Sequence, residues 1–119
     1  MQKVLIVAHE GPYGSEKLFN ALRMAIAMKE FAADEAEIKL FLMSDAVFGA
    51  VKGQKTPDLS YNLQQMLEIL TAQQVPLLLC KTCAESRGVT QEMLIDGAAI
   101  GTLSELTRWT LDADKVMHI

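Results

Sequence analysis

Short, continuous apolar runs alternate along this chain with longer segments of helical periodicity, and this alternation is the feature that most constrains the fold. The runs that we interpret as strands are Lys3–Ala8, Glu37–Met43, Val75–Cys80, Ala98–Ile100 and the closing residues 114–119. Continuous apolar runs are typical of parallel strands that are buried on both faces. The sequence therefore predicts an α/β fold built on a mainly parallel sheet of about five strands.

The intervening segments carry helix signals. Ser15–Phe31 is predicted to be a helix with Ser15 as its N-cap, and Leu63–Gln73 is predicted to be a second. Thr102 is followed three residues later by a glutamate, which is the capping-box pattern of a third long helix. A shorter helix is expected to begin after Thr90.

The 119 residues fit one domain, residues 1–119, without repeats or a linker. The long segment Ser44–Ser60 has no clear periodicity. In a small domain such a segment either covers a functional site or is an ordinary surface loop, and both interpretations stay open.

Composition excludes several classes of protein. Half of the residues are hydrophobic and 22% are charged, which is usual for a globular domain. The net charge is -4 and basic residues form no cluster, so a nucleic-acid partner is not expected. Neither a signal-peptide pattern nor an apolar stretch of about 18 residues is present, so we predict a cytoplasmic protein without membrane contact and with reduced cysteines.

The predicted topology brings three polar segments to one edge. In open parallel sheets, functional sites form at the carboxyl ends of the strands. Cys80 ends the third predicted strand, "HEGPYGS" follows the first, and "SDA", which contains Asp45, follows the second. We therefore expect a thiol and two loops to meet at a crevice there.

Cys80 and Cys83 are the two cysteines of the chain, and their spacing allows several chemistries. A structural zinc needs about four ligands. His9 can reach the same edge, but His118 is expected at the surface, so we predict no metal and no cofactor. C-x-x-C is also a redox spacing, although a thioredoxin-like pair stands at the head of a long helix after an early strand.

Two other interpretations of the cysteines remain. Both can act as small hydrophobic residues, which suits Cys80 better because it continues an apolar strand. Alternatively, Cys80 accepts sulfur as a persulfide, which requires a reachable thiolate. Lys81, Arg87 and a helical turn after Cys80 are expected to favour that thiolate, and Cys83 is placed to discharge or protect the persulfide.

The loop "GPYGS" joins the first predicted strand to the first helix. Its residues Gly11, Tyr13, Gly14 and Ser15 are candidates for an anion site, because backbone N–H groups at a helix N-terminus favour anions. The same glycines also suit a plain tight turn. Asp45 either lines this site or caps the turn that follows the second strand.

Several segments together resemble the DsrE/DsrF-like family, and most closely its small YchN-type members. They are "HEGPYGSEKLFNALRMAIAM", "LFLMSDAV", "QQMLEILTAQ", "LCKTCAESRG", "LIDGAAIGTLSELTRWTL" and "ADKV", in the family's order over nearly the whole chain. The resemblance implies a three-layer α/β/α domain that assembles into homotrimers or homohexamers. It also implies persulfide transfer between proteins, as in the family's sulfur-relay subunits.

In those relay subunits the sulfur-bearing cysteine follows a strand and precedes an Arg-Gly pair, so the resemblance assigns that role to Cys80, ahead of Arg87 and Gly88. The second cysteine, Cys83, departs from the relay pattern. The sequence thus predicts a persulfide carrier with a protein donor or acceptor. The alternatives are a non-catalytic oligomeric module that binds an anion or a partner, and a thiol–disulfide redox protein.

Overall fold

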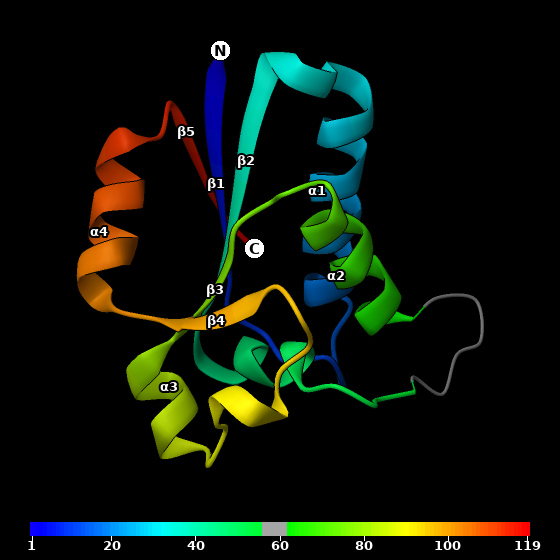
Figure 1. Cartoon of the computed structure of the whole chain (residues 1–119), viewed down its shortest axis with the longest axis vertical. Helices are drawn as coiled ribbons and strands as arrows, with labels where there is room; N and C mark the ends of the chain where they lie inside the picture. Colours follow the sequence, from blue (N-terminus) through cyan, green and yellow to red (C-terminus); the bar gives the residue numbers. More distant parts are fainter. Residues whose placement is uncertain (56–61) are drawn as a thin grey trace.

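The computed structural model describes residues 1–55 and 62–119. In these residues the sheet has five strands in the order β4-β3-β2-β1-β5, and every neighbouring pair is parallel (Figure 1). The strands are β1 (Gln2–Ala8), β2 (Ala36–Leu42), β3 (Leu77–Cys80), β4 (Ala98–Gly101) and β5 (Lys115–His118). The predicted α/β fold is confirmed.

Helices lie on both sides of the sheet and make three layers (Figure 1). They are α1 (Lys17–Ala32), α2 (Leu63–Ala72), α3 (Lys81–Ser86) and α4 (Leu103–Asp112), with the 3-10 helices η1 (Ala33–Glu35), η2 (Ser44–Ala50) and η3 (Gln91–Met93). α1 and α2 pack on one face, which we call the α1/α2 face, and α4 lies on the other, the α4 face. None of the described helices has the length and apolar character needed to cross a membrane.

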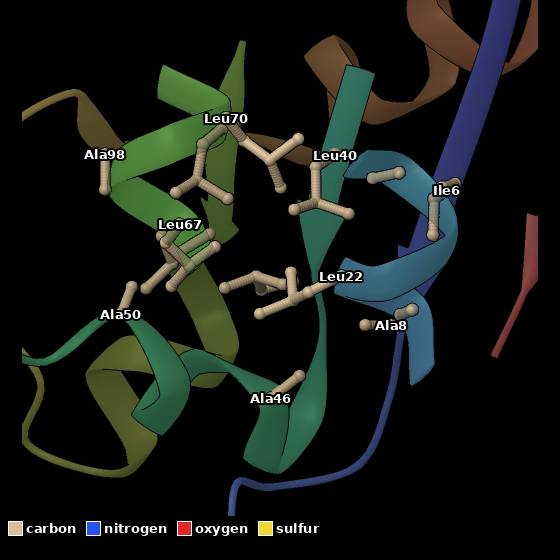
Figure 2. Close-up of a cluster of buried hydrophobic side chains, with 14 of the residues drawn as sticks. Ile6, Ala8, Leu22, Leu40, Ala46, Ala50, Leu67, Leu70 and Ala98 are labelled. Carbon is tan, nitrogen blue, oxygen red and sulfur yellow. The ribbon is translucent and has the colours of Figure 1, made fainter. Parts of the chain in front are cut away.

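The α1/α2 face holds the main core. Leu22 from α1, Leu40 from β2, and Leu67 and Leu70 from α2 are fully buried and point toward one another (Figure 2). Burying a leucine side chain contributes roughly 1.5–3 kcal/mol, so this cluster is the largest source of stability in the fold.

The α4 face is covered much less completely. Its buried cluster consists of Leu5, Val7 and Phe41, and the Trp109 ring meets Phe41 edge-on with centroids 6.0 Å apart. α4 itself contains no buried residue. Leu103 and Leu111 on this helix are 75% and 82% exposed, so the α4 face presents apolar surface to the solvent.

Two predicted boundaries are wrong by two residues. α1 begins at Lys17 with Glu16 as N-cap, and Ser15 instead accepts a hydrogen bond from the Lys17 N–H at 3.1 Å. β3 begins at Leu77, after the proline of residue 76, which has no N–H to donate to a ladder. The helices predicted after Thr90 and Thr102 are present, and Thr102 forms the predicted capping box.

The first part of the predicted long loop is helical and belongs to the core. In η2 the side chains of Ala46, Val47 and Ala50 are fully buried, so this part is a structural segment and not a cover over a site. Small apolar residues allow a short 3-10 helix to pack closely under the sheet edge. Residues 56–60 of the predicted loop lie outside the described residues.

Candidate functional site

The carboxyl edge of the sheet collects most of the candidate residues. Because the strands are parallel, the segments that follow β1, β2 and β3 all leave at this edge. They are the loop that contains Gly11, the helix η2 that contains Asp45, and the helix α3, which starts directly after Cys80. Figure 1 shows η2 and α3 together at this end of the sheet.

Cys80 is both the last residue of β3 and the N-cap of α3. Its Sγ accepts a hydrogen bond from the backbone N–H of Cys83 at 3.3 Å. The abrupt change from strand to helix holds the thiol against the first turn of α3, whose N–H groups have no partner within the helix. Both cysteines are free thiols and both are partly buried.

The two thiols face different surroundings. The Cys80 side chain packs against the cluster on the α4 face, whereas the Cys83 side chain packs against the main core. The sequence predicts a turn between the cysteines, and the structure contains that turn as the start of α3. The turn brings the backbone of Cys83 to the Cys80 sulfur.

Burial raises the pKa of the Cys80 thiol, and the hydrogen bond with the Cys83 side chain raises it further. The backbone N–H groups of Cys83 and Thr82 act in the opposite direction but are outweighed. The predicted activation of this thiolate by nearby positive charge is therefore wrong for the resting protein. The Cys80 thiol is therefore less acidic than an ordinary cysteine.

Arg87 does not face the thiol, because its guanidinium is engaged elsewhere. Its Nε donates to Oδ1 of Asp45 at 2.8 Å, and its Nη1 donates to the carbonyl of Cys83 at 3.2 Å. Nη1 also donates to the Ser86 hydroxyl at 3.1 Å. Arg87 thus fastens α3 to η2 and positions the segment that bears the cysteines. Lys81, the other predicted cation, is exposed on the first turn of α3.

Asp45 is the ion-pair partner of Arg87 and not the cap of its helix, since Met43 occupies the N-cap of η2. Gly11 approaches Asp45 so closely that a Cβ at residue 11 would lie 3.3 Å from the Asp45 Cβ. A larger residue at that position would push the two segments apart. Gly11, Asp45, Arg87 and Cys83 therefore form a continuous chain of contacts across the edge.

The rest of the predicted anion loop is tied to the segment after η2. The exposed Tyr13 donates its hydroxyl proton to Oε1 of Gln54 at 2.9 Å. Gly14 has a φ of +85°, a conformation that glycine adopts without strain. These contacts account for the loop as a tight turn, and anion binding by Gly11, Tyr13, Gly14 and Ser15 stays a prediction.

The structure also brings together two histidines that no local sequence pattern pairs. Nε2 of His9 and Nδ1 of His118 lie 2.9 Å apart. His118 is exposed, as expected, but its pairing with His9 was not predicted. The pairing depends on β5 lying beside β1, and no local pattern indicates that strand order. In residues 1–55 and 62–119 no group of three or more His, Cys, Asp or Glu side chains is placed to hold a metal ion.

The geometry of the edge can be compared with that of known proteins. The model of the DsrE/DsrF-like family matches residues 2–119. The chain belongs to the DsrE/DsrF-like family. It is 60% identical to the protein YchN of Escherichia coli over 117 residues, which cover 98% of each chain. It is also 33% identical to an uncharacterized protein of Methanopyrus kandleri, over 96% of this chain and 91% of the relative.

Solved structures agree with this assignment. The crystal structure of E. coli YchN superposes with a TM-score of 0.94 at 58% identity, and all of each chain is covered. A protein of unknown function from Methanobacterium thermoautotrophicum shares the fold with a TM-score of 0.79 at 13% identity. The names of these proteins state no reaction, so the chemistry has to be argued from the residues of this chain.

Proposed function

We propose that this DsrE/DsrF-like protein carries sulfane sulfur as a persulfide on Cys80. The observation that carries the proposal is the position of Cys80: it ends a parallel strand at the carboxyl edge, it caps α3, and the residue is partly exposed. The family's sulfur-relay subunits bear sulfur at the corresponding place, after a strand and before an Arg-Gly pair. Cys80 must be reduced to accept sulfur, which fits the cytoplasmic location that the sequence predicts.

Loading is a thiol–disulfide type of exchange. The Cys80 sulfur attacks the outer sulfur of a donor persulfide, the bond between the two donor sulfurs breaks, and the donor leaves as a thiolate. One S–S bond forms and one breaks, so no external oxidant is needed. Burial makes the proton of the Cys80 thiol harder to remove, and the departing donor thiolate takes up this proton, so the step balances in protons as well as in S–S bonds.

Cys83 is the thiol that we propose to discharge the persulfide. The backbone N–H of Cys83 lies 3.3 Å from the Cys80 sulfur, in the first turn of α3. The Cys83 side chain is therefore attached to the backbone close to the Cys80 sulfur. Attack of the Cys83 thiolate on the inner sulfur forms the Cys80–Cys83 disulfide and releases hydrogen sulfide, which carries away the two electrons and the outer sulfur. A disulfide between these positions needs the Cα atoms about 5.5 Å apart, a separation that one helical turn provides.

The protein is also proposed to act as a homotrimer or homohexamer, with a sulfur donor or acceptor protein as a further partner. The exposed Leu103 and Leu111 on α4 support self-association, since burying them against a second copy removes apolar surface from water. We therefore propose that the α4 face, which is only sparsely covered in the described structure, is the surface through which the copies associate.

The test is sulfur loading followed by intact mass. Protein incubated with a cysteine desulfurase and cysteine should gain about 32 Da per sulfur atom, and dithiothreitol should remove the gain. Cys80→Ser should gain nothing, whereas Cys83→Ser, the matched control, should gain sulfur and keep it longer than the unmodified protein. If the Cys80→Ser variant gains sulfur and the Cys83→Ser variant gains none, Cys83 and not Cys80 is the carrier.

The same samples separate the alternatives. A thiol–disulfide redox protein would exchange readily with oxidised glutathione, would lose about 2 Da through an internal disulfide and would take up no sulfur. An oligomeric binding module would show neither change while both cysteines are intact.

A further inference from the structure

His9 and His118 are the two histidines of the chain, and the fold brings them together from its two ends. Nε2 of His9 lies 2.9 Å from Nδ1 of His118, and the two ring planes differ by 24°. The ring centroids are 5.1 Å apart, a separation that is compatible with the short N···N contact only when both nitrogens lie between the centroids. The ring nitrogens therefore face one another.

The backbone fixes this arrangement. The His9 N–H donates to the carbonyl of Ile119 at 3.0 Å, and the Ile119 N–H donates to the carbonyl of Val7 at 2.9 Å. His118 is paired with Val7 in the β1–β5 ladder. The two imidazoles thus project from neighbouring strands that are already hydrogen-bonded, so bringing them together costs little conformational entropy.

We propose that His9 and His118 form a chelating site for a divalent transition-metal ion of borderline softness, such as Cu²⁺ or Ni²⁺. Imidazole is a preferred ligand of these ions. In the neutral pair one ring donates an N–H to the other. When the metal ion binds, that proton moves through solvent to the other nitrogen of the same ring, so both facing nitrogens offer a lone pair and both rings stay neutral. Water fills the remaining coordination positions, since no third metal-ligating side chain stands beside the pair in residues 1–55 and 62–119.

The spacing favours two adjacent ligand positions on one ion. Metal–nitrogen bonds of about 2.0–2.1 Å at a right angle place the two nitrogens about 2.9 Å apart. The separation in the structure is the same, so each ring only has to turn until its lone pair meets the ion. His118 is exposed and His9 is partly buried, which leaves the pair accessible to an ion from solution.

This site is separate from the cysteines, although both lie at the carboxyl edge. His9 directly follows β1 and His118 ends β5, whereas Cys80 ends β3, and β2 lies between β3 and β1. The metal proposal therefore stands or falls independently of sulfur transfer.

Cu²⁺–iminodiacetate is a suitable probe, because the chelator leaves adjacent positions for two imidazoles. The protein should carry Cys80→Ser and Cys83→Ser, so that thiols neither bind nor reduce copper. Titration should saturate at one copper per chain, and the electron paramagnetic resonance spectrum should show two imidazole nitrogens. Since the chain contains no other histidine, both nitrogens must come from this pair.

His9→Gln and His118→Gln should each weaken binding by more than about tenfold and leave at most one imidazole in the spectrum. Unchanged binding in both variants, or a one-imidazole spectrum of the protein that retains both histidines, would overturn the proposal. If a variant does not fold, the test is chemical protection of the protein that retains both histidines. Bound copper should slow the modification of both histidines by diethyl pyrocarbonate. Modification at the same rate with and without copper would exclude the site.

Discussion

The two faces of the sheet differ in how much apolar core they bury. On the α1/α2 face, two helices and η2 bury a continuous core that includes Leu22 and Leu67. On the α4 face, the described cluster contains three fully buried side chains, and the helix that covers it buries none of its own. One face therefore supplies most of the stability of the chain, and the other leaves apolar surface available for a second molecule.

The alternation of side chains along the strands directs the Cys80 side chain to the α4 face. Leu77 and Leu79 of β3 point into the main core, so Leu78 and Cys80 point the other way. The Cys80 side chain therefore packs outside the main core. The α1/α2 face therefore holds most of the buried core, and the proposed carrier Cys80 lies against the thinner cluster on the α4 face.

The largest expected effect is on the α1/α2 face. Leu67→Ala removes a fully buried side chain and should lower the free energy of unfolding by about 2–5 kcal/mol. Leu111→Ala, on the α4 face, should change it by less than about 0.5 kcal/mol when the protein is monomeric. Urea denaturation measures both values, and similar losses in the two variants would contradict the division between the faces.

The next effect concerns assembly. Leu103→Ser with Leu111→Ser should lower the mass measured by light scattering from that of a trimer or hexamer, because the polar side chains remove the apolar contact that we propose. Phe31→Ser is the matched control, since Phe31 is 96% exposed on α1. If Phe31→Ser dissociates the oligomer and the double variant does not, self-association uses another surface.

A smaller effect is expected at the contact between η2 and α3. Asp45→Asn removes the charge that pairs with Arg87 at 2.8 Å, and should cost about 0.2–1 kcal/mol because Asp45 is exposed. Asp34→Asn, at an exposed aspartate in η1, should cost nothing measurable. Equal unfolding midpoints for Asp45→Asn and the unmodified protein would show that the ion pair does not hold α3 in place.

The smallest effect is the dependence of stability on pH. Burial, and then the neighbouring His118, lower the pKa of His9 below its ordinary value of 6.5. The unfolded chain therefore binds a proton first, so stability should fall as the pH drops from 6.5 toward the lower pKa of folded His9. In the His9→Gln variant the thermal unfolding midpoint should depend less on pH within that window. If the pH dependence is the same as in the unmodified protein, groups other than His9 cause it.

The elements of this fold are readable from the sequence because each strand is a continuous apolar run and each long helix has an apolar period. The η2 segment and its contact with α3 are harder to predict from the sequence. Ser44–Ala50 shows no hydrophobic periodicity, because a short 3-10 helix of small residues can pack against the core without a regular apolar pattern. The partner of Arg87 lies 42 residues away, and only the strand order brings Asp45 to it.

The same reasoning separates the two pairs of chemical groups at the carboxyl edge. Cys80 and Cys83 are neighbours in sequence, so their meeting was predicted, but the raised pKa of Cys80 depends on burial that no local pattern shows. His9 and His118 are 109 residues apart and meet because β5 pairs with β1.

The most direct test of sulfur transfer is to locate the added sulfur atom by peptide mapping. Trypsin cleaves after Lys81 and so places Cys80 and Cys83 in different peptides, the second being residues 82–87. After loading with a cysteine desulfurase and trapping with iodoacetamide, the additional 32 Da or so should be found in the peptide that ends at Lys81. Sulfur found only in the peptide that contains Cys83, or in neither, would contradict the assignment of Cys80 as the carrier.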